Sequence, residues 1–134
     1  MPALPHAVMI HSFEQGRAAL APGLPVTLLS GPGAALYAGV PWWCALMAEL
    51  HAQDPARPFP DLLDCADAPG FAAQALRLGR KGLIIAVAEP RLAAHIAALA
   101  AEAGAVLLAA PPPALDLAQR GAERRLAAWL SGER

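Results

Sequence analysis

The sequence predicts an α/β protein: a single-domain three-layer α/β/α fold, spanning residues 1–134, around a mostly parallel five-stranded sheet. Three observations predict this class. Short apolar runs alternate with alanine-rich helical runs, so that a βα unit repeats five times. Such alternation implies parallel strands joined by right-handed crossovers. The apolar runs are largely uninterrupted, as in strands buried on both faces, and a length of 134 residues suits one domain.

The first half of the chain carries local signals for where its helices begin and end. Ser12, with Gln15 three residues later, forms a capping-box pattern that starts a helix at Phe13. Pro22 and Gly23 end that helix. We therefore predict the following elements for this half: strands 7–10 and 25–30, and helices 13–20, 34–38 and 41–50.

The second half contains shorter βα units with clear punctuation. The segment 82–88 is the clearest strand because it is rich in β-branched and aliphatic residues. Pro90 opens a helix that Gly104 ends, and Asp67 is expected to cap the helix that begins near Pro69. The predicted elements of this half are strands 61–65, 82–88 and 105–110, and helices 69–78, 90–103 and 114–130.

A truncated or half (βα) barrel is the competing architecture. The last three βα units recur at about the shortest spacing that a crossover allows. The segment from Asp67-Ala68-Pro69-Gly70 through Ala75–Gly79 to Leu83–Ile85 also resembles late βα units of many (βα)-barrel enzymes. This resemblance covers a small part of the chain and is common among βα repeats.

Composition and charge exclude some classes of partner. The formal net charge is -1, and Arg120, Arg124 and Arg125 alternate with acidic residues, so we expect no nucleic-acid partner. No charged residue occurs between Arg17 and Glu49, but prolines and glycines interrupt that stretch and exclude a spanning helix. We expect no membrane partner.

The same composition predicts self-association. Hydrophobic residues make up 57% of the chain and charged residues only 16%. A soluble monomer needs more polar surface than this, so we expect part of the apolar surface to be covered in a homodimer or another homo-oligomer.

Cysteine usage indicates the cellular compartment, and lysine usage indicates the kind of genome that encodes the protein. The two cysteines, Cys44 and Cys65, show no disulfide framework and indicate reduced thiols in the cytoplasm. The single lysine among abundant arginine and alanine is typical of a GC-rich bacterial genome. Metal ligands are not clustered along the chain, so no metal site is predicted, and no cofactor is expected.

Polar residues follow several predicted strands at their carboxyl ends, and in a parallel sheet these ends form one ligand-binding edge. Three of them are candidates for proton transfer: His11, Asp64 and Glu89. Four others are candidates for holding a ligand in the turn between strand and helix: Ser30, Gly31, Gly33 and Asp67. A turn of this kind can hold a phosphate or carboxylate on free N–H groups, although it also has a sufficient structural role.

Two other features have structural interpretations. Neighbouring carboxylates would raise the pKa of the Cys65 thiol and the following helix start would lower it, and because these effects oppose each other Cys65 is interpreted as a buried thiol. Trp42 and Trp43 point about 100° apart on a helix, so one is expected in the core and the other nearer the surface.

Two functions from different classes remain open at this point. The first is a small cytosolic bacterial α/β protein, with enzymatic activity undecided, that binds a small anionic ligand at the carboxyl edge of its sheet. The second is a non-catalytic oligomeric domain without a small-molecule site. Convergence of His11, Asp64 and Glu89 within hydrogen-bonding reach of one cleft would favour the first. If they face separate surfaces, the enzymatic interpretation fails.

Overall fold

The computed structural model describes residues 3–132, so that residues 1–2 and 133–134, at the two ends of the predicted domain, lie outside the description. The α/β class with a parallel sheet is confirmed, and within the described residues the sheet has six strands, one more than predicted. The strands are β1 (Ala7–Met9), β2 (Thr27–Leu29), β3 (Asp61–Asp64), β4 (Gly82–Ile84), β5 (Val106–Leu108) and β6 (Ala114–Asp116). The helices are α1 (Phe13–Leu20), α2 (Ala34–Tyr37), α3 (Val40–Gln53), α4 (Pro69–Arg77), α5 (Pro90–Ala103), the 3₁₀ helix η1 (Glu123–Arg125) and α6 (Leu126–Leu130).

The additional strand lies where the sequence predicts the beginning of a long helix. Residues 114–130 do not form one helix: Ala114–Asp116 pair with β1, turns follow, and only η1 and α6 are helical. Alanine and leucine favour a helix locally, but pairing with β1 buries Leu115 against the helix side of the sheet. Tertiary contact therefore overrides local propensity at this position.

The order of the strands is that of a ring opened at one place. The sheet reads β5-β4-β3-β2-β1-β6, and every neighbouring pair is parallel. From β1 to β5 each strand is added on the same side of the one before it, while β6 returns to the free side of β1. A cyclic order from β1 to β6 would close a six-stranded barrel, and the gap lies between β5 and β6.

The helices cover one face of this sheet. Right-handed crossovers that always advance in the same direction place their helices on the same face. Accordingly, helical side chains pack in one large core with strand residues such as Val8, Leu28 and Leu63. The opposite face forms a second cluster to which the described residues contribute only strand positions: Ala7, Leu29, Leu62 and Ile84, with Met9, Leu108 and Ala114 at its margin. The predicted second helical layer is absent from residues 3–132, and the half-barrel alternative describes the arrangement better.

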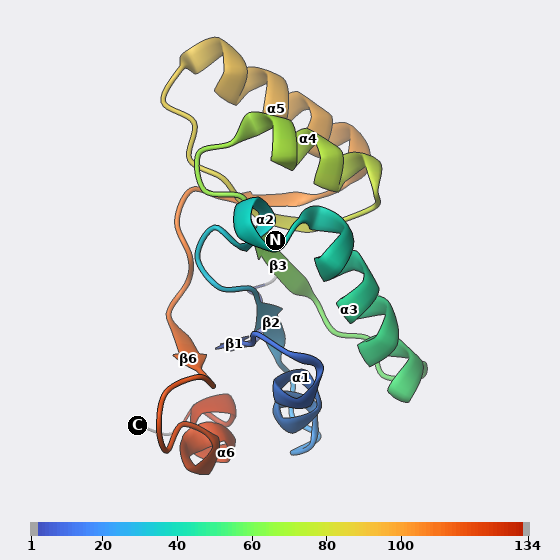
Figure 1. Ribbon diagram of the computed structural model, residues 1–134, viewed down its shortest axis with the longest axis vertical. Coiled ribbons are helices and arrows are strands. Elements are labelled where there is room, and N and C mark those ends of the chain that lie inside the picture. Colours follow the sequence, from blue (N-terminus) through green and yellow to red (C-terminus); the bar gives the residue numbers. More distant parts are fainter. Residues whose placement is uncertain (1–2, 133–134) are drawn as a thin grey trace.

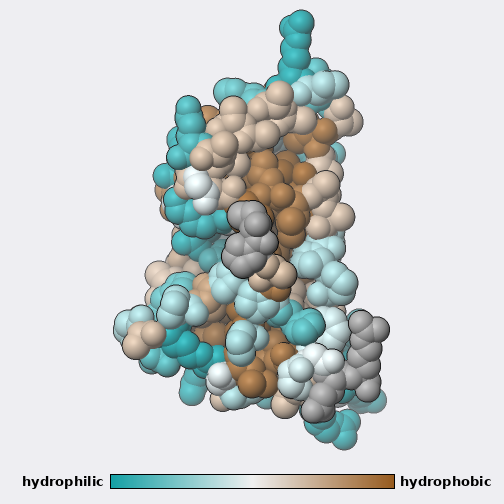
Figure 2. Space-filling model, turned by 180° about the vertical axis from the view of Figure 1, so that it is seen from behind, coloured by the Kyte–Doolittle hydropathy of each residue, from teal (hydrophilic) through white to brown (hydrophobic). Residues whose placement is uncertain are grey.

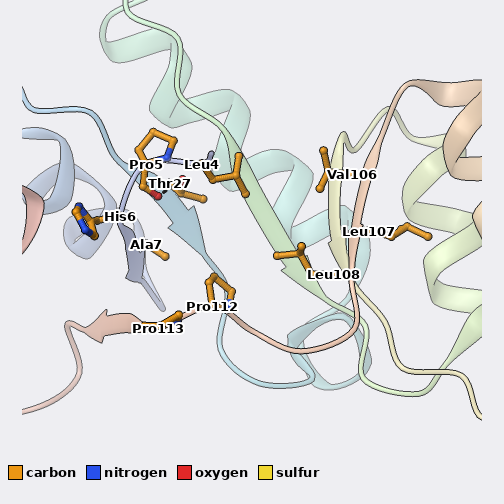
Figure 3. A pocket seen from close by; sticks show the side chains of 10 residues that line it. All are labelled: Leu4, Pro5, His6, Ala7, Thr27, Val106, Leu107, Leu108, Pro112 and Pro113. Atoms are coloured by element: carbon orange, nitrogen blue, oxygen red, sulfur yellow. Dashed lines mark hydrogen bonds between the residues drawn. The ribbon is translucent and has the colours of Figure 1, made fainter. Parts of the chain in front are cut away.

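Curvature closes the face that no helix covers. A cavity of about 570 Å³ is lined by β5 on one side and by the segment Leu4–Ala7, at the start of β1, on the other. Since three strands separate β5 from β1 in the sheet, the sheet must curl to bring these segments to one cavity. Figure 3 shows the two groups of side chains, with Pro112 and Pro113 below them in the view. Thr27 holds the leading segment in place by donating from Oγ1 to the Pro5 carbonyl (2.7 Å).

The helices form an arc outside the curled strands (Figure 1), and the segment from β5 to β6 runs down the open side. The side of the molecule seen in Figure 2 has a central band of hydrophobic residues flanked by hydrophilic ones. Among residues 3–132, no helix is both long enough and apolar enough to cross a bilayer. The result is an open, barrel-like layer of strands with the helices on its outer side.

The predicted start of α1 is confirmed in detail. Ser12 is the N-cap, and its Oγ accepts a hydrogen bond from the Gln15 amide (3.1 Å). The Gln15 side chain returns to the amide of His11 (2.8 Å), one residue earlier than in the usual capping box. Gln15 therefore fixes the backbone of His11, directly after β1.

Candidate functional site

His11 and Asp116 form a hydrogen-bonded pair at the β1–β6 end of the carboxyl edge. Met9 of β1 lies in register with Asp116 of β6, so the histidine two residues after Met9 meets the last residue of the neighbouring strand. His11 Nε2 lies 2.8 Å from Asp116 Oδ1. The two side chains are 33% and 29% exposed, so both can be reached from solvent.

The partner fixes the role of each imidazole nitrogen. An ionised carboxylate only accepts hydrogen bonds, so Nε2 carries the hydrogen that points at Asp116. The same Asp116 oxygen also accepts from the Ala118 amide (2.9 Å), which holds the carboxylate in place. Nδ1 makes no hydrogen bond within the described residues and faces Gly31. His11 therefore presents one nitrogen to a prospective ligand.

Gly31 provides the space in which His11 meets a second functional group. A Cβ at this glycine would lie 2.6 Å from the Tyr37 hydroxyl oxygen and 3.1 and 3.2 Å from His11 Cε1 and Nδ1. Both side chains therefore rest over the Gly31 backbone, and any side chain there would displace them. Tyr37 ends α2 and is 68% exposed. The Tyr37 hydroxyl and the His11 imidazole therefore lie close together over Gly31, which is itself buried.

Ser30 and Asp64, by contrast, tie the ends of two strands together. Ser30 is 1% exposed; its Oγ accepts from the Asp64 amide (2.9 Å) and donates to the Gly31 carbonyl (3.1 Å). Asp64 Oδ1 accepts from the amide of Ala66 (2.8 Å), a residue with a positive φ of 52°. These bonds stabilise the turn that follows β3. Their geometry gives both residues a structural role beside the predicted functional one.

The two remaining candidates of the ligand-binding set lie in turns. Gly33 has a φ of 67° and precedes α2, so it provides the left-handed conformation that the turn requires. Asp67 does not cap α4 as predicted: Ala68 occupies the N-cap position, without a side-chain hydrogen bond. Asp64 stabilises the turn at Ala66, and the N-cap lies one residue beyond Asp67, while the helix begins at Pro69 as predicted.

Glu89 acts as the N-cap of α5. Its two carboxylate oxygens accept from the amides of Arg91 (3.0 Å) and Leu92 (2.9 Å). Within the described residues, no hydrogen bond joins His11 to Asp64 or to Glu89. Of the three predicted proton-transfer residues, only His11 thus has its side chain hydrogen-bonded to another side chain within the described residues.

Sequence reasoning missed both partners of His11. Asp116 falls in the segment predicted as a helix, where it is one of several charges on a solvated face. Tyr37 is the only tyrosine of the chain, and its position seven residues after Ser30 gives no local signal of contact with His11. The one sequence feature that singled out Tyr37 was the rarity of tyrosine in a chain that is 5% aromatic.

The Cys65 thiol and the hydrogen-bonded pair of Trp43 and Asp61 lie on the helix side of the sheet, apart from His11 and Asp116. Burial, and secondarily the Asp64 carboxylate, raises the pKa of the Cys65 thiol to about 12, which agrees with its interpretation as an unreactive thiol. Trp43 is fully buried and donates from Nε1 to Asp61 (2.9 Å), while Trp42 is half-buried, as the helical spacing predicts. Burial raises the pKa of Asp61, an effect that Arg80 opposes.

Among the described residues, no group of three or more His, Cys, Asp or Glu side chains is arranged to hold a metal ion. No protein-family model matches the sequence, and a search of curated proteins finds no match either. The geometry of the carboxyl edge is therefore the basis for inferring a function.

Proposed function

We propose that the protein binds a small anionic molecule at the carboxyl edge of its sheet, above Gly31, with His11 as its principal contact. The observation that supports this proposal most strongly is the His11–Asp116 pair at 2.8 Å, with the other imidazole nitrogen free and turned toward Gly31. In its protonated form, His11 has a donor at each ring nitrogen. One donor is committed to Asp116 and the other remains for the ligand.

Tyr37 supplies a second donor to the same place. Its hydroxyl lies over Gly31 beside the imidazole, so a carboxylate or phosphate oxygen above this glycine can accept from both side chains. A hydrogen bond from a charged donor to an anionic oxygen is about twice as strong as a neutral one. Charge on the ligand therefore adds directly to its affinity.

The neighbouring carboxylates restrict where an anion can lie. Asp64 is 6% exposed at the end of β3, and Glu89 lies at the start of α5. Both would repel an anion placed on their side of the edge. We therefore propose that the ligand binds over the ends of β1 and β2, beside His11 and Tyr37 and on the side away from Asp64 and Glu89.

Ligand-induced thermal stabilisation tests this proposal, because a molecule that binds the native state raises the melting temperature. The probes are inorganic phosphate, acetate and succinate, each small anions, with acetamide and succinamide as uncharged analogues of the same shape. We expect the melting temperature to rise with at least one anion and not with the matched amides. Equal stabilisation by an anion and its amide would contradict the proposal.

Substitutions identify the contact. His11→Asn should weaken anion binding by about 10-fold or more, the loss of one charge-assisted hydrogen bond. Tyr37→Phe, which removes only an exposed hydroxyl, should weaken it by about 5-fold. The control is His95→Asn, since His95 is exposed on α5. Unchanged affinity in both the His11 and the Tyr37 variants would refute the assigned site.

A second candidate function, a non-catalytic oligomeric domain, is favoured by a separate observation: the described residues leave one face and one edge of the sheet apolar and without a helical cover. The two functions make different predictions for the anion titration, because only the first requires saturable binding that depends on His11.

A further inference from the structure

The two edge strands of the sheet differ in their protection against pairing. β6 follows Pro111-Pro112-Pro113 and ends in Asp116, and proline and charge are two of the usual means by which proteins block an exposed edge. β5 consists of Val106, Leu107 and Leu108, with Gly104-Ala105 before it and Ala109-Ala110 after it. No charged residue, proline or bulge interrupts that edge.

The outer hydrogen-bonding groups of β5 belong to Leu107. The Val106 amide donates to the Lys81 carbonyl (2.8 Å), and the Leu108 carbonyl accepts from the Ile85 amide (2.9 Å), so these two residues of β5 face β4. Backbone groups alternate in direction along a strand, and those of Leu107 therefore point away from the sheet. Within residues 3–132, no strand pairs with β5 on that side.

Apolar hollows lie on both sides of the same strand. The cavity of about 570 Å³ lies on the inner face, and Figure 3 shows the Leu108 side chain pointing into it while Leu107 points the other way. A second cavity, of about 520 Å³, lies between the end of β5 and Ala93 and Ile96 of α5. Leu107 and Leu108 line both cavities. An added strand would find a hollow for its side chains on either face.

We propose that the edge of β5 is a dimer interface, on which β5 of a second copy of this chain pairs in antiparallel orientation about Leu107. The pairing is self-complementary. Leu107 and the partner's Leu107 exchange two backbone hydrogen bonds, and Val106 lies opposite the partner's Leu108. Every side chain in this register meets an apolar one, and the flanking glycine and alanines bring no like charges together.

The contrast between the two edges favours this occupant over others. A contact between β5 and the partner's β6 would have to form against the prolines and Asp116, and it would join copies head to tail. The antiparallel contact is isologous, so it closes at two copies and leaves both protected β6 edges outside. It also covers apolar surface in a chain that is 57% hydrophobic and 16% charged.

Sedimentation velocity of the full chain at micromolar concentration tests the pairing. We expect the mass of a dimer for the unmodified protein and of a monomer for Leu107→Lys, because lysine at an edge blocks pairing. The matched control is Leu92→Lys, an exposed leucine on α5 (44% exposed), which should remain dimeric. A monomeric unmodified protein, or an equal effect of the two substitutions, would overturn the proposal.

A covalent test covers the outcome in which Leu107→Lys fails to fold. In a Cys44→Ser background, Leu107→Cys should form a disulfide-linked dimer under mild oxidation. Residues opposite each other in a hydrogen-bonded antiparallel pair have Cα atoms about 5.5 Å apart, which suits a disulfide. Leu92→Cys in the same background should stay monomeric on a non-reducing gel. Failure of Leu107→Cys to cross-link more than Leu92→Cys would also overturn the proposal.

Discussion

The two faces of the sheet bury equally apolar side chains by different means. Leu28 and Leu63 lie under helices in the larger core, whereas Leu29 and Leu62 point to the opposite face, where the described residues provide no helix. All four are nonetheless at most 1% exposed. On the second face, curvature turns neighbouring strands toward one another, so that the strands cover their own side chains. A curled sheet can therefore replace a layer of helices.

Adjacent leucines of β3 provide the sharpest test of this comparison and the largest expected effect. Leu63→Ala removes a side chain from a core confined by helices and should lower the free energy of unfolding by about 4 kcal/mol. Leu62→Ala, on the curled face, should lower it by about 2 kcal/mol, because the strands there can relax into the void. Urea unfolding of both variants measures the difference. Equal losses would mean that the two faces are equally rigid.

Gly82 tests whether the curled face depends on close strand approach. It precedes Leu83 and Ile84 in β4, and a Cβ there would collide with the Asp61 carbonyl oxygen and lie 2.8 Å from Leu62 Cδ2. Gly82→Ala should therefore destabilise the protein by about 2 kcal/mol. Gly70→Ala is the control, because nothing lies within 4 Å of its added Cβ. A Gly82→Ala variant as stable as the control would show that the strands tolerate separation.

Asp61, on the helix-covered face, provides the smallest expected effect, which is a dependence of the free energy of unfolding on pH. Burial raises its pKa in the folded protein above 3.8, in spite of Arg80. Between 3.8 and the raised value the folded state binds more protons than the unfolded state, so this contribution to stability is lost as the pH rises through that window. Asp61→Asn cannot titrate.

The measurement is urea unfolding at about pH 4 and about pH 7. The unmodified protein should lose more stability over this range than Asp61→Asn, which retains an acceptor for Trp43. Asp54→Asn, an exposed site, is the matched control. If the Asp61 variant shows the same dependence on pH as the unmodified protein, another group is responsible for it.

Elements with local signals were predictable from the sequence. The capping pattern at Ser12 starts α1 as expected, and α5 runs from Pro90 to Ala103 with the predicted bounds. β6 was not predictable, because Ala114–Asp116 has helical propensity and becomes a strand only by pairing with β1. The layer arrangement failed for a related reason: strands buried on both faces were interpreted as lying between two helical layers, whereas here curvature buries one face.

The candidate site divides in the same way. His11 follows β1 and could be found from its position at a strand end. Asp116 could not, because its placement requires the strand that local propensity conceals, and Tyr37 reaches His11 only through the turn at Gly31. Glu89 and Ser30 were found as polar residues at strand ends. In the structure Glu89 caps its own helix and Ser30 bonds to the neighbouring strand, and their sequence positions do not separate such structural roles from functional ones.

The pairing of β6 with β1 has a consequence for how the protein matures. His11 and Asp116 are 105 residues apart, so their hydrogen bond can form only after β6 has been synthesised and has paired with β1. Contacts this distant in sequence form slowly and late. A nascent or truncated chain that lacks β6 contains His11 but not its partner. Binding of the proposed ligand through His11 would then depend on the docking of β6 against β1.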